Sequence, residues 1–467
     1  MSAESPPSAT LTLPTPRPAS APRERLFRAL LLLALPVLAE NTLNILVGLT
    51  DAYLANHLPE DIRVDATAAV GTVTYLMWFL GLFATAIGTG ATAIIARATG
   101  ARHRGRAHAA AGQALLLAAV AGVLLGMVFF SLAYPIAHVA GLSERPASLA
   151  AQYLRIFAPC VPAMLLLMVA NACLRGAGDT RTPAAAMILV NLLNIALSVT
   201  LTYGYLGLPA LGFRGIVLGT TLAYAVGAVL QLTVLLSGWG RLHVRLPRLR
   251  FHPPEMGRLL RVGLPAGAEQ CLNWGVNFFL VHVVNQLGPV SSAAHFNTIR
   301  IESLSYTTGF AVGIATSTMV GQSLGMRDVG RARRSVRYGL MLGAGTMAFL
   351  GLTFVLLSGG YAAAMSADPA VTQLTSECLF IAGFVQFGFG AYIIFAAALR
   401  GAGDTRGAMM VNLLSICGFR LVGVWLVGVY FKLDLAAVWI VLSAELMLRG
   451  LFMYARYASG KWETVRV

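Results

Sequence analysis

The sequence predicts an all-α polytopic membrane protein with twelve transmembrane helices, and three observations lead to this prediction. Apolar residues make up 57% of the 467 residues and charged residues only 11%, against about 25% charge in a soluble domain. Long stretches contain no Asp, Glu, Lys or Arg, and several exceed the roughly 20 residues that cross a bilayer. Motifs recur in the second half of the chain, which predicts two six-helix lobes related by a parallel pseudo-two-fold repeat.

The composition also excludes several classes of protein. So few charges would not cover the surface of a soluble protein of this length, and the apolar content is too high for a disordered chain. The apolar runs are unbroken, whereas a β-barrel requires alternating ten-residue strands. The net charge of +15 lies in short clusters between apolar runs, which is typical of membrane loops, so we expect no nucleic-acid partner. The five cysteines show no metal-like spacing, and we expect neither a metal nor a cofactor.

Breaks at glycine, proline and charge clusters define the predicted elements. We expect a disordered cytosolic tail over residues 1–24, a first lobe over 25–237, a basic linker over 238–257, a second lobe over 258–456 and a cytosolic tail over 457–467. The twelve helices are expected to centre near residues 42, 80, 122, 162, 193, 224, 272, 308, 345, 388, 417 and 444.

Arginine is concentrated in alternate loops. The opposite set of loops holds little beyond Arg63, Arg145, Arg214 and Lys432. Because arginine-rich loops remain on the cytosolic side, we expect a multi-pass protein of the cytoplasmic (inner) membrane with both termini in the cytosol. An even number of helices agrees with that orientation.

The chain repeats itself. The octapeptide Leu-Arg-Gly-Ala-Gly-Asp-Thr-Arg occupies residues 174–181 and recurs at residues 399–406. In each copy the glycines permit a tight turn, and Asp179 and Asp404 are expected to cap the helix that follows. The arginines are expected to hold the loop at the lipid surface.

Two further pairs follow the same order along the chain. Gly100 and Gly325 are separated by 225 positions, as the octapeptides are, and Glu40 and Glu269 are separated by 229. Three matches at nearly one offset indicate an internal duplication.

The two six-helix halves, the paired octapeptides and the first-helix sequence Leu-Thr-Asp-Ala-Tyr at residues 49–53 resemble the multidrug and toxic compound extrusion (MATE) family. The resemblance covers about residues 25–455. It implies a secondary transporter in which H⁺ or Na⁺ flows in while amphipathic, often cationic, organic molecules flow out by alternating access between two lobes. The expected partners are small organic substrates and the lipid bilayer, and we expect a monomer.

Two alternatives come from other functional classes. A flippase for lipid-linked precursors resembles a related branch of the superfamily, and it would line its cavity with several Arg or Lys side chains. A membrane enzyme would need a catalytic cluster at bilayer depth. His282 and His295 stand alone there, which disfavours an enzyme.

Ionisable residues at bilayer depth are candidates for function because each is costly to bury. Glu40 and Asp51 are eleven residues apart in the first helix, so they share a face roughly 16 Å apart, with Asn44 between them. Asp51 matches the family's first-helix carboxylate, and the resemblance implies that it binds the coupling cation, H⁺ or possibly Na⁺.

The fifth helix carries a second polar face with Asn191, Asn194 and Ser198. By resemblance, Ser198 stands where many family members have Asp. Thr220 or Thr221 of the sixth helix is expected to supply a further oxygen to a cation site around Asp51. Because Ser198 removes a second negative charge, the sequence favours H⁺ over Na⁺. The alternative for these residues is interhelical hydrogen bonding.

Substrate contact or gating is the hypothesis for a third group, and structural burial is the alternative for its two acids. Aromatic rings suit flat cations. The group consists of Glu40, Asn44, Glu269, Asn273, Asn277 and Phe389. Arg420 in the eleventh helix needs a partner if it is buried, and Glu445 or Glu302 is expected to supply it.

Overall fold

The computed structural model describes residues 23–238, 242–244 and 251–465, and within these ranges the regular structure is entirely helical. The first half contains α1 (Arg23–Asn56), α2 (Glu60–Gly100), α3 (Arg104–Ser131), α4 (Ala133–Val139), α5 (Glu144–Phe157), α6 (Val161–Gly176), α7 (Arg181–Tyr203) and α8 (Phe213–Ser237). The second half contains α9 (Pro253–Gln286), α10 (Pro289–Gly325), α11 (Val329–Gly339), α12 (Gly345–Met365), α13 (Pro369–Ala402), α14 (Thr405–Ser415), α15 (Val422–Val424) and α16 (Leu435–Ala458).

The helices form twelve membrane spans. Ten stretches are long and apolar enough to cross a bilayer, with α5–α6, α11–α12 and α14–α15 each forming one stretch. The other two spans are α9 and α10, which have 34 and 37 residues and are more polar because they carry charged and amide side chains. Each expected helix centre falls within one of these spans, which confirms the twelve-helix prediction.

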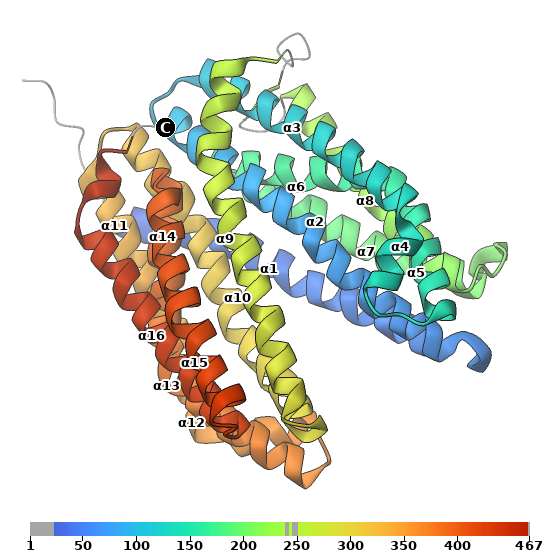
Figure 1. The fold of residues 1–467 in the computed structure, drawn as a ribbon. Helices are drawn as coiled ribbons and strands as arrows, with labels where there is room; N and C mark the ends of the chain where they lie inside the picture. The colour runs from blue at the N-terminus through green and yellow to red at the C-terminus, as the bar shows by residue number, and fades with distance from the viewer. Residues whose placement is uncertain (1–22, 239–241, 245–250, 466–467) are drawn as a thin grey trace, which may run out of the picture.

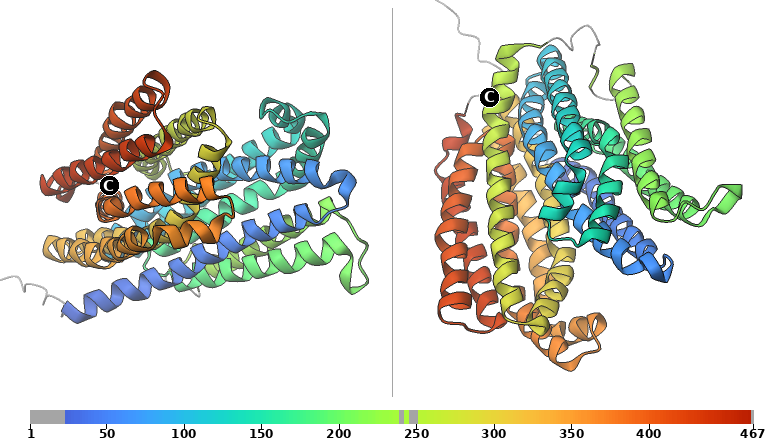
Figure 2. Two further views of the ribbon diagram at one scale, coloured as in Figure 1. Left: turned by 90° about the horizontal axis from the view of Figure 1, so that it is seen from below. Right: turned by 45° about the vertical axis from the view of Figure 1, so that its right-hand side comes forward.

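The two halves form two lobes. Figures 1 and 2 show α1–α8 gathered in one lobe and α9–α16 in the other, with the lobes side by side at one end and apart at the other. The first turns of α1 pack within the core of the second lobe, through Leu26, Leu30 and Ala34. In the matching exchange, α9 packs on α2, where a Cβ added at Gly90 would lie 2.6 Å from the Leu259 carbonyl oxygen.

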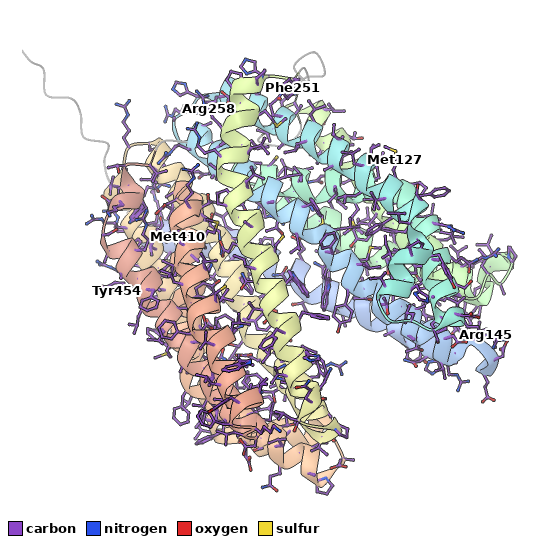
Figure 3. The ribbon with its side chains drawn as sticks, in the orientation of Figure 1. Met127, Arg145, Phe251, Arg258, Met410 and Tyr454 are labelled. Carbon is purple, nitrogen blue, oxygen red and sulfur yellow. The ribbon has the colours of Figure 1, made fainter. Side chains whose placement is uncertain are left out.

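Large apolar side chains cover the outside of both lobes. Met127, Met410 and Tyr454 project outward in Figure 3, and each is at least half exposed. Arg145 and Arg258 lie at opposite ends of the molecule in the same view. Apolar flanks with charges at the ends are the surface that a bilayer requires.

The lobes meet through a symmetric backbone contact, here called the glycine contact, formed by Gly100, Gly325, Arg97 and Gln322. A Cβ added at Gly100 would lie 1.9 Å from the Gln322 carbonyl oxygen, and one added at Gly325 would lie 2.1 Å from the Arg97 carbonyl oxygen. The offset of 225 residues relates Gly100 to Gly325, and it also relates Arg97 to Gln322. The two halves of the contact therefore exchange under the repeat, and only glycine permits this approach.

The residues after α16 fold back over the same end and touch both lobes. Trp462 is 1% exposed and stacks on Tyr457 with 5.2 Å between the ring centroids. Glu463 forms an ion pair of 2.7 Å with Arg333 of the second lobe. The Val465 carbonyl oxygen accepts a hydrogen bond from Arg97 of the first lobe. This segment, here called the C-terminal strap (residues 459–465), therefore links the lobes.

The glycine contact generates a stability prediction. Gly100→Ala should lower the free energy of unfolding by about 1–3 kcal/mol, because the added methyl overlaps the Gln322 backbone and forces the helices apart. The midpoint of thermal unfolding of the purified protein measures this change. Gly105→Ala is the matched control, since a Cβ at Gly105 meets nothing within 4 Å. Equal stability of the two variants would contradict the prediction.

Candidate functional site

The polar face of α1 is turned toward other helices of the first lobe. The Glu40 carboxylate lies 3.2 Å from the Arg175 guanidinium of α6. The Asn44 side-chain oxygen accepts a hydrogen bond of 3.1 Å from the Asn191 amide of α7. The face predicted from spacing is therefore an interior face, and it leads along α1 toward Asp51.

Asp51 has a carboxylate oxygen, Oδ1, that is buried and has no hydrogen-bond partner among the described residues. The phenol groups of Tyr153 on α5 and Tyr224 on α8 lie close enough for the charge of Asp51 to act on them. Buried acceptors normally have a partner. A proton or a small cation at this oxygen would satisfy it, and the surrounding phenol and hydroxyl oxygens are suitable neighbours for either.

Asn194 and Thr220 form a hydrogen-bonded pair between α7 and α8. The Asn194 amide donates to the Thr220 hydroxyl at 2.9 Å, and that hydroxyl donates to the Ile216 carbonyl oxygen at 3.2 Å. The buried Tyr153 of α5 lies near Thr220. The side-chain oxygen of Asn194 is buried without a partner among the described residues. Through Tyr153, this pair is joined to the surroundings of Asp51.

Ser198 is enclosed by backbone. It is fully buried, and its hydroxyl donates to the Ile216 carbonyl oxygen at 3.3 Å. A Cβ added at Gly219 would lie 2.3 Å from the Ser198 Oγ. The small serine side chain therefore allows α7 and α8 to pack closely. A larger acidic side chain would not fit at this position, which explains why serine and not aspartate stands here.

The second lobe repeats the ion pair of the first. Glu269 is 1% exposed and accepts hydrogen bonds from the Arg400 guanidinium and the Asn412 amide. Glu269 and Arg400 are the repeat copies of Glu40 and Arg175. For Arg175 and Arg400 the expectation that the octapeptide arginines hold their loops at the lipid surface is wrong, because both side chains turn inward to a buried acid. The other two, Arg181 and Arg406, are exposed. An acid and an arginine retained in both copies were the signal for this pairing.

The capping prediction for the octapeptides is confirmed. The Asp404 carboxylate accepts from the Gly407 amide at 3.2 Å, and the Asp179 carboxylate accepts from the Thr182 amide at 3.1 Å. The turn glycines Gly178 and Gly403 have φ values of 85° and 88°, a region that glycine enters without steric cost.

The remaining candidates on α9 and α13 make mostly local contacts. The Asn273 amide donates to the Glu269 carbonyl oxygen on its own helix at 3.0 Å. The Asn277 side-chain oxygen accepts from Arg420 at 3.3 Å. The half-buried Phe389 ring stacks on Tyr392 with 6.3 Å between centroids. These residues therefore do not gather around Asp51.

A buried charge cluster in the second lobe contains Arg420, Glu445 and Arg449. Glu445 lies 2.8 Å from Arg420 and 2.6 Å from Arg449, and it accepts from Ser415 at 2.6 Å. The predicted pairing of Arg420 with Glu445 is confirmed. Arg449 was missed, although its i,i+4 spacing from Glu445 was the available signal.

Asp51 differs from most acids at bilayer depth because it has no arginine partner in the part of the chain that the structure describes. Glu40, Glu269 and Glu445 each have an arginine partner. Glu302 accepts a hydrogen bond of 2.9 Å from Gln386. Within the described ranges, no group of three or more His, Cys, Asp or Glu residues is arranged to hold a metal ion. A Na⁺ ion at Asp51 would therefore depend on amide, hydroxyl and phenol oxygens.

Comparison with known proteins agrees with this architecture. The MatE family model matches residues 36–200 and 265–448, once in each lobe. A probable multidrug resistance protein NorM of Thermotoga maritima is 30% identical over 440 residues, covering 93% of each chain. A probable multidrug resistance protein YoeA of Bacillus subtilis is 25% identical, covering 92% of this chain and 93% of its own.

A solved structure shares the fold. The MATE transporter VcmN of Vibrio cholerae in its bent form matches with a TM-score of 0.85 and 19% identity, covering 94% of this chain and 97% of that chain. A further relative in Bacillus subtilis is named an uncharacterized transporter YisQ, and the solved structure is named a MATE transporter, in agreement with the expected class. The family model matches both lobes, and relatives align along nearly the whole chain. This integral membrane protein therefore belongs to the MatE family, the MATE transporters.

Proposed function

We propose that this chain is a multidrug antiporter that couples cation entry to the export of lipophilic, often cationic, organic compounds. The observation that carries the proposal is Asp51, whose buried carboxylate oxygen lacks a partner in the described structure. The names of the relatives, which are multidrug resistance proteins, support the substrate class. Asn191, Asn194 and Thr220 extend the polar surroundings from which a cation would reach the acid.

The proposed orientation places the glycine contact and both termini in the cytosol. The arginine-rich loops support this placement, since the contact lies beside Arg97, Arg102 and Arg327. The lobes lie side by side at the end with the glycine contact and apart at the opposite end (Figure 1). In the proposed orientation, this arrangement is open to the outside of the cell. Movement of the lobes about this contact would give access from the cytosol. We place the protein in the cytoplasmic membrane.

The flippase alternative receives less support. A flippase cavity for anionic headgroups needs uncompensated cations, whereas four deep arginines bind buried acids. The arginines with such partners are Arg175, Arg400, Arg420 and Arg449.

Asp51→Asn should abolish uphill export while leaving expression unchanged, because an amide of the same shape neither gains nor loses a proton. Uptake of a lipophilic cation into everted vesicles, which corresponds to export from the cell, measures this effect. Asp61→Asn, the same change at an exposed position at the start of α2, is the control and should export as the unmodified protein does. Normal export by the Asp51 variant would refute the role of this acid.

We favour H⁺ as the coupling ion. A dehydrated Na⁺ needs a cage of oxygen ligands that replaces its water shell. Ser198, which stands where a second acid would help, donates its hydroxyl proton to a backbone carbonyl instead. A proton requires only the carboxylate of Asp51, whose buried oxygen has no hydrogen-bond partner among the described residues.

Proteoliposomes distinguish the two ions. A pH gradient in Na⁺-free buffer should drive export, and an inward Na⁺ gradient at equal pH should give background rates. The reverse pattern, with transport under the Na⁺ gradient alone, would overturn the choice of proton while leaving the role of Asp51 intact.

We further propose that Glu40 and Glu269 stabilise their lobes and do not bind substrate. Each is buried against an arginine in the last turn of a transmembrane helix. Removing one member of a buried pair leaves an uncompensated charge.

Arg400→Met should therefore lower the free energy of unfolding by about 3–5 kcal/mol. The double variant Glu269→Gln/Arg400→Met should recover much of that loss, because no charge remains unpaired. Thermal unfolding midpoints and the KM for export measure the two roles separately. A KM raised tenfold in Glu269→Gln, with unchanged stability, would instead indicate contact with substrate.

A further inference from the structure

A cavity at the far end of the first lobe, opposite the glycine contact, is separate from the site at Asp51. We propose that this cavity binds the phosphate of an anionic phospholipid headgroup in the adjacent leaflet. Its volume is about 520 Å³, which falls in the range of small-molecule sites. Its polar lining residues are Tyr134, Ser148, Gln152, Arg155 and Arg214.

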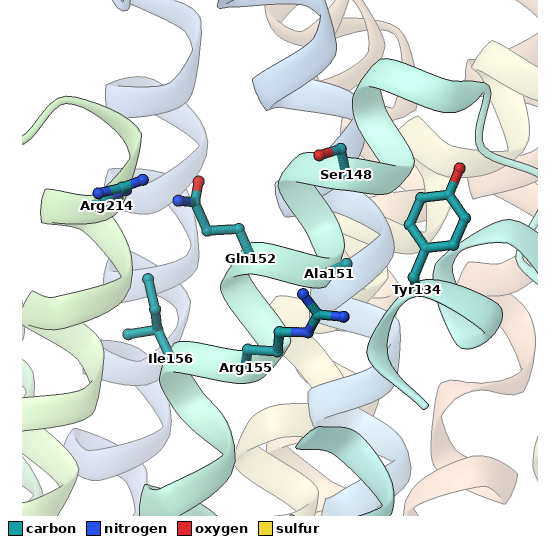
Figure 4. Close-up of a pocket in the computed structure, with 7 residues that line it drawn as sticks. All are labelled: Tyr134, Ser148, Ala151, Gln152, Arg155, Ile156 and Arg214. Atoms are coloured by element: carbon teal, nitrogen blue, oxygen red, sulfur yellow. The ribbon is translucent and has the colours of Figure 1, made fainter. Parts of the chain in front are cut away.

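Three helices build the cavity. Ser148, Gln152 and Arg155 lie on one face of α5 at spacings of four and three residues, so successive turns present them together. Arg214 is the second residue of α8, and Tyr134 belongs to α4. Figure 4 shows Arg214 across from Gln152, and Tyr134 on the other side of Arg155.

The cavity is positively charged. Its lining contains two guanidinium groups and neither Asp nor Glu. With its amide oxygen turned toward α8, Gln152 accepts from Arg214 at 2.9 and 2.6 Å. This neutral partner orients the Arg214 guanidinium without cancelling its charge. Arg155 is exposed and makes no hydrogen bond or ion pair with the part of the chain that the structure describes.

The chemistry of these groups favours a phosphate. Guanidinium groups bind phosphate oxygens through two parallel hydrogen bonds. The hydroxyl groups of Tyr134 and Ser148 are additional donors at the same cavity. An anion bound between Arg155 and Arg214 would supply the counter-charge that the lining lacks.

The position of the cavity favours a lipid as the source of that phosphate. Arg214 lies where α8 begins, and the α5 residues lie one to three turns after the start of their helix. Helix ends in membrane proteins lie at the depth of the headgroups, where tyrosine is also enriched. Basic pockets between transmembrane helices recognise anionic headgroups in this way.

The test uses the purified full chain in detergent, titrated with phosphatidylglycerol, with phosphatidylcholine of the same acyl chains, and with inorganic phosphate. Native mass spectrometry measures the bound fraction. We expect phosphatidylglycerol to bind more tightly than phosphatidylcholine. Each of Arg155→Ala and Arg214→Ala should weaken phosphatidylglycerol binding about fivefold, and the double variant about 25-fold.

Two matched variants keep the proposal falsifiable. Arg145→Ala removes an exposed arginine near the same end that does not line the cavity, and it should bind as the unmodified protein does. Arg155→Lys/Arg214→Lys keeps the charge but loses the paired hydrogen bonds, so its affinity should lie between the two extremes. Unchanged elution in size-exclusion chromatography verifies that each variant is folded.

Several results would overturn the proposal. Equal binding of phosphatidylglycerol by the alanine double variant would exclude the cavity, and an equal loss in Arg145→Ala would indicate a general surface effect. If inorganic phosphate bound as tightly as phosphatidylglycerol, the ligand would be a soluble anion and not a lipid. None of these outcomes affects the proposed antiport, because the cavity shares no residue with the surroundings of Asp51.

Discussion

An ionised side chain inside a bilayer needs a partner within the protein, because no water is available to solvate it. This constraint organises the interior of both lobes. Arginine binds Glu40, Glu269 and Glu445, and the pairs of Glu40 and Glu269 connect helices that are distant in sequence. The acid that departs from the pattern in the first lobe is Asp51. An acid without an arginine can change its charge at modest cost, whereas a paired acid would leave its partner uncompensated.

The duplicated halves share a backbone plan but differ in chemistry. The offset of 229 that relates Glu40 to Glu269 also relates Asn44 to Asn273. At the same offset, the residue that corresponds to Asp51 is Leu280. Leu280 is 5% exposed within the apolar core of the second lobe. The structural ion pair is therefore present in both lobes, whereas Asp51 has no acidic counterpart at the matching position of the second lobe. The backbone is therefore duplicated, but the proposed cation site at Asp51 belongs to the first lobe.

The sequence predicted the features that depend on many residues or on local spacing. Apolar runs of about 20 residues define the spans. Each residue of a run adds a small free energy of transfer into the bilayer, so the prediction does not depend on any single side chain. The cap formed by Asp404 is local and follows from residue type. The pairing of Arg420 with Glu445 followed from the cost of burying a charge. The inward turn of Arg175 and Arg400 was not predicted, because the partner of a long flexible side chain depends on tertiary packing. Tyr153 and the C-terminal strap were missed for the same reason, since their partners lie on helices distant in sequence.

The glycine contact has the geometry of an isologous interface, in which one surface patch meets its own copy. Gly100 approaches Gln322, and the corresponding Gly325 approaches Arg97. A separate six-helix protein with one copy of this patch would carry, on one surface, both the glycine and the backbone carbonyl that the glycine of a second copy approaches. Two such proteins inserted in the same direction would pair through it as a homodimer. The fused chain therefore preserves, between its own lobes, the interface by which an ancestral subunit would recognise itself.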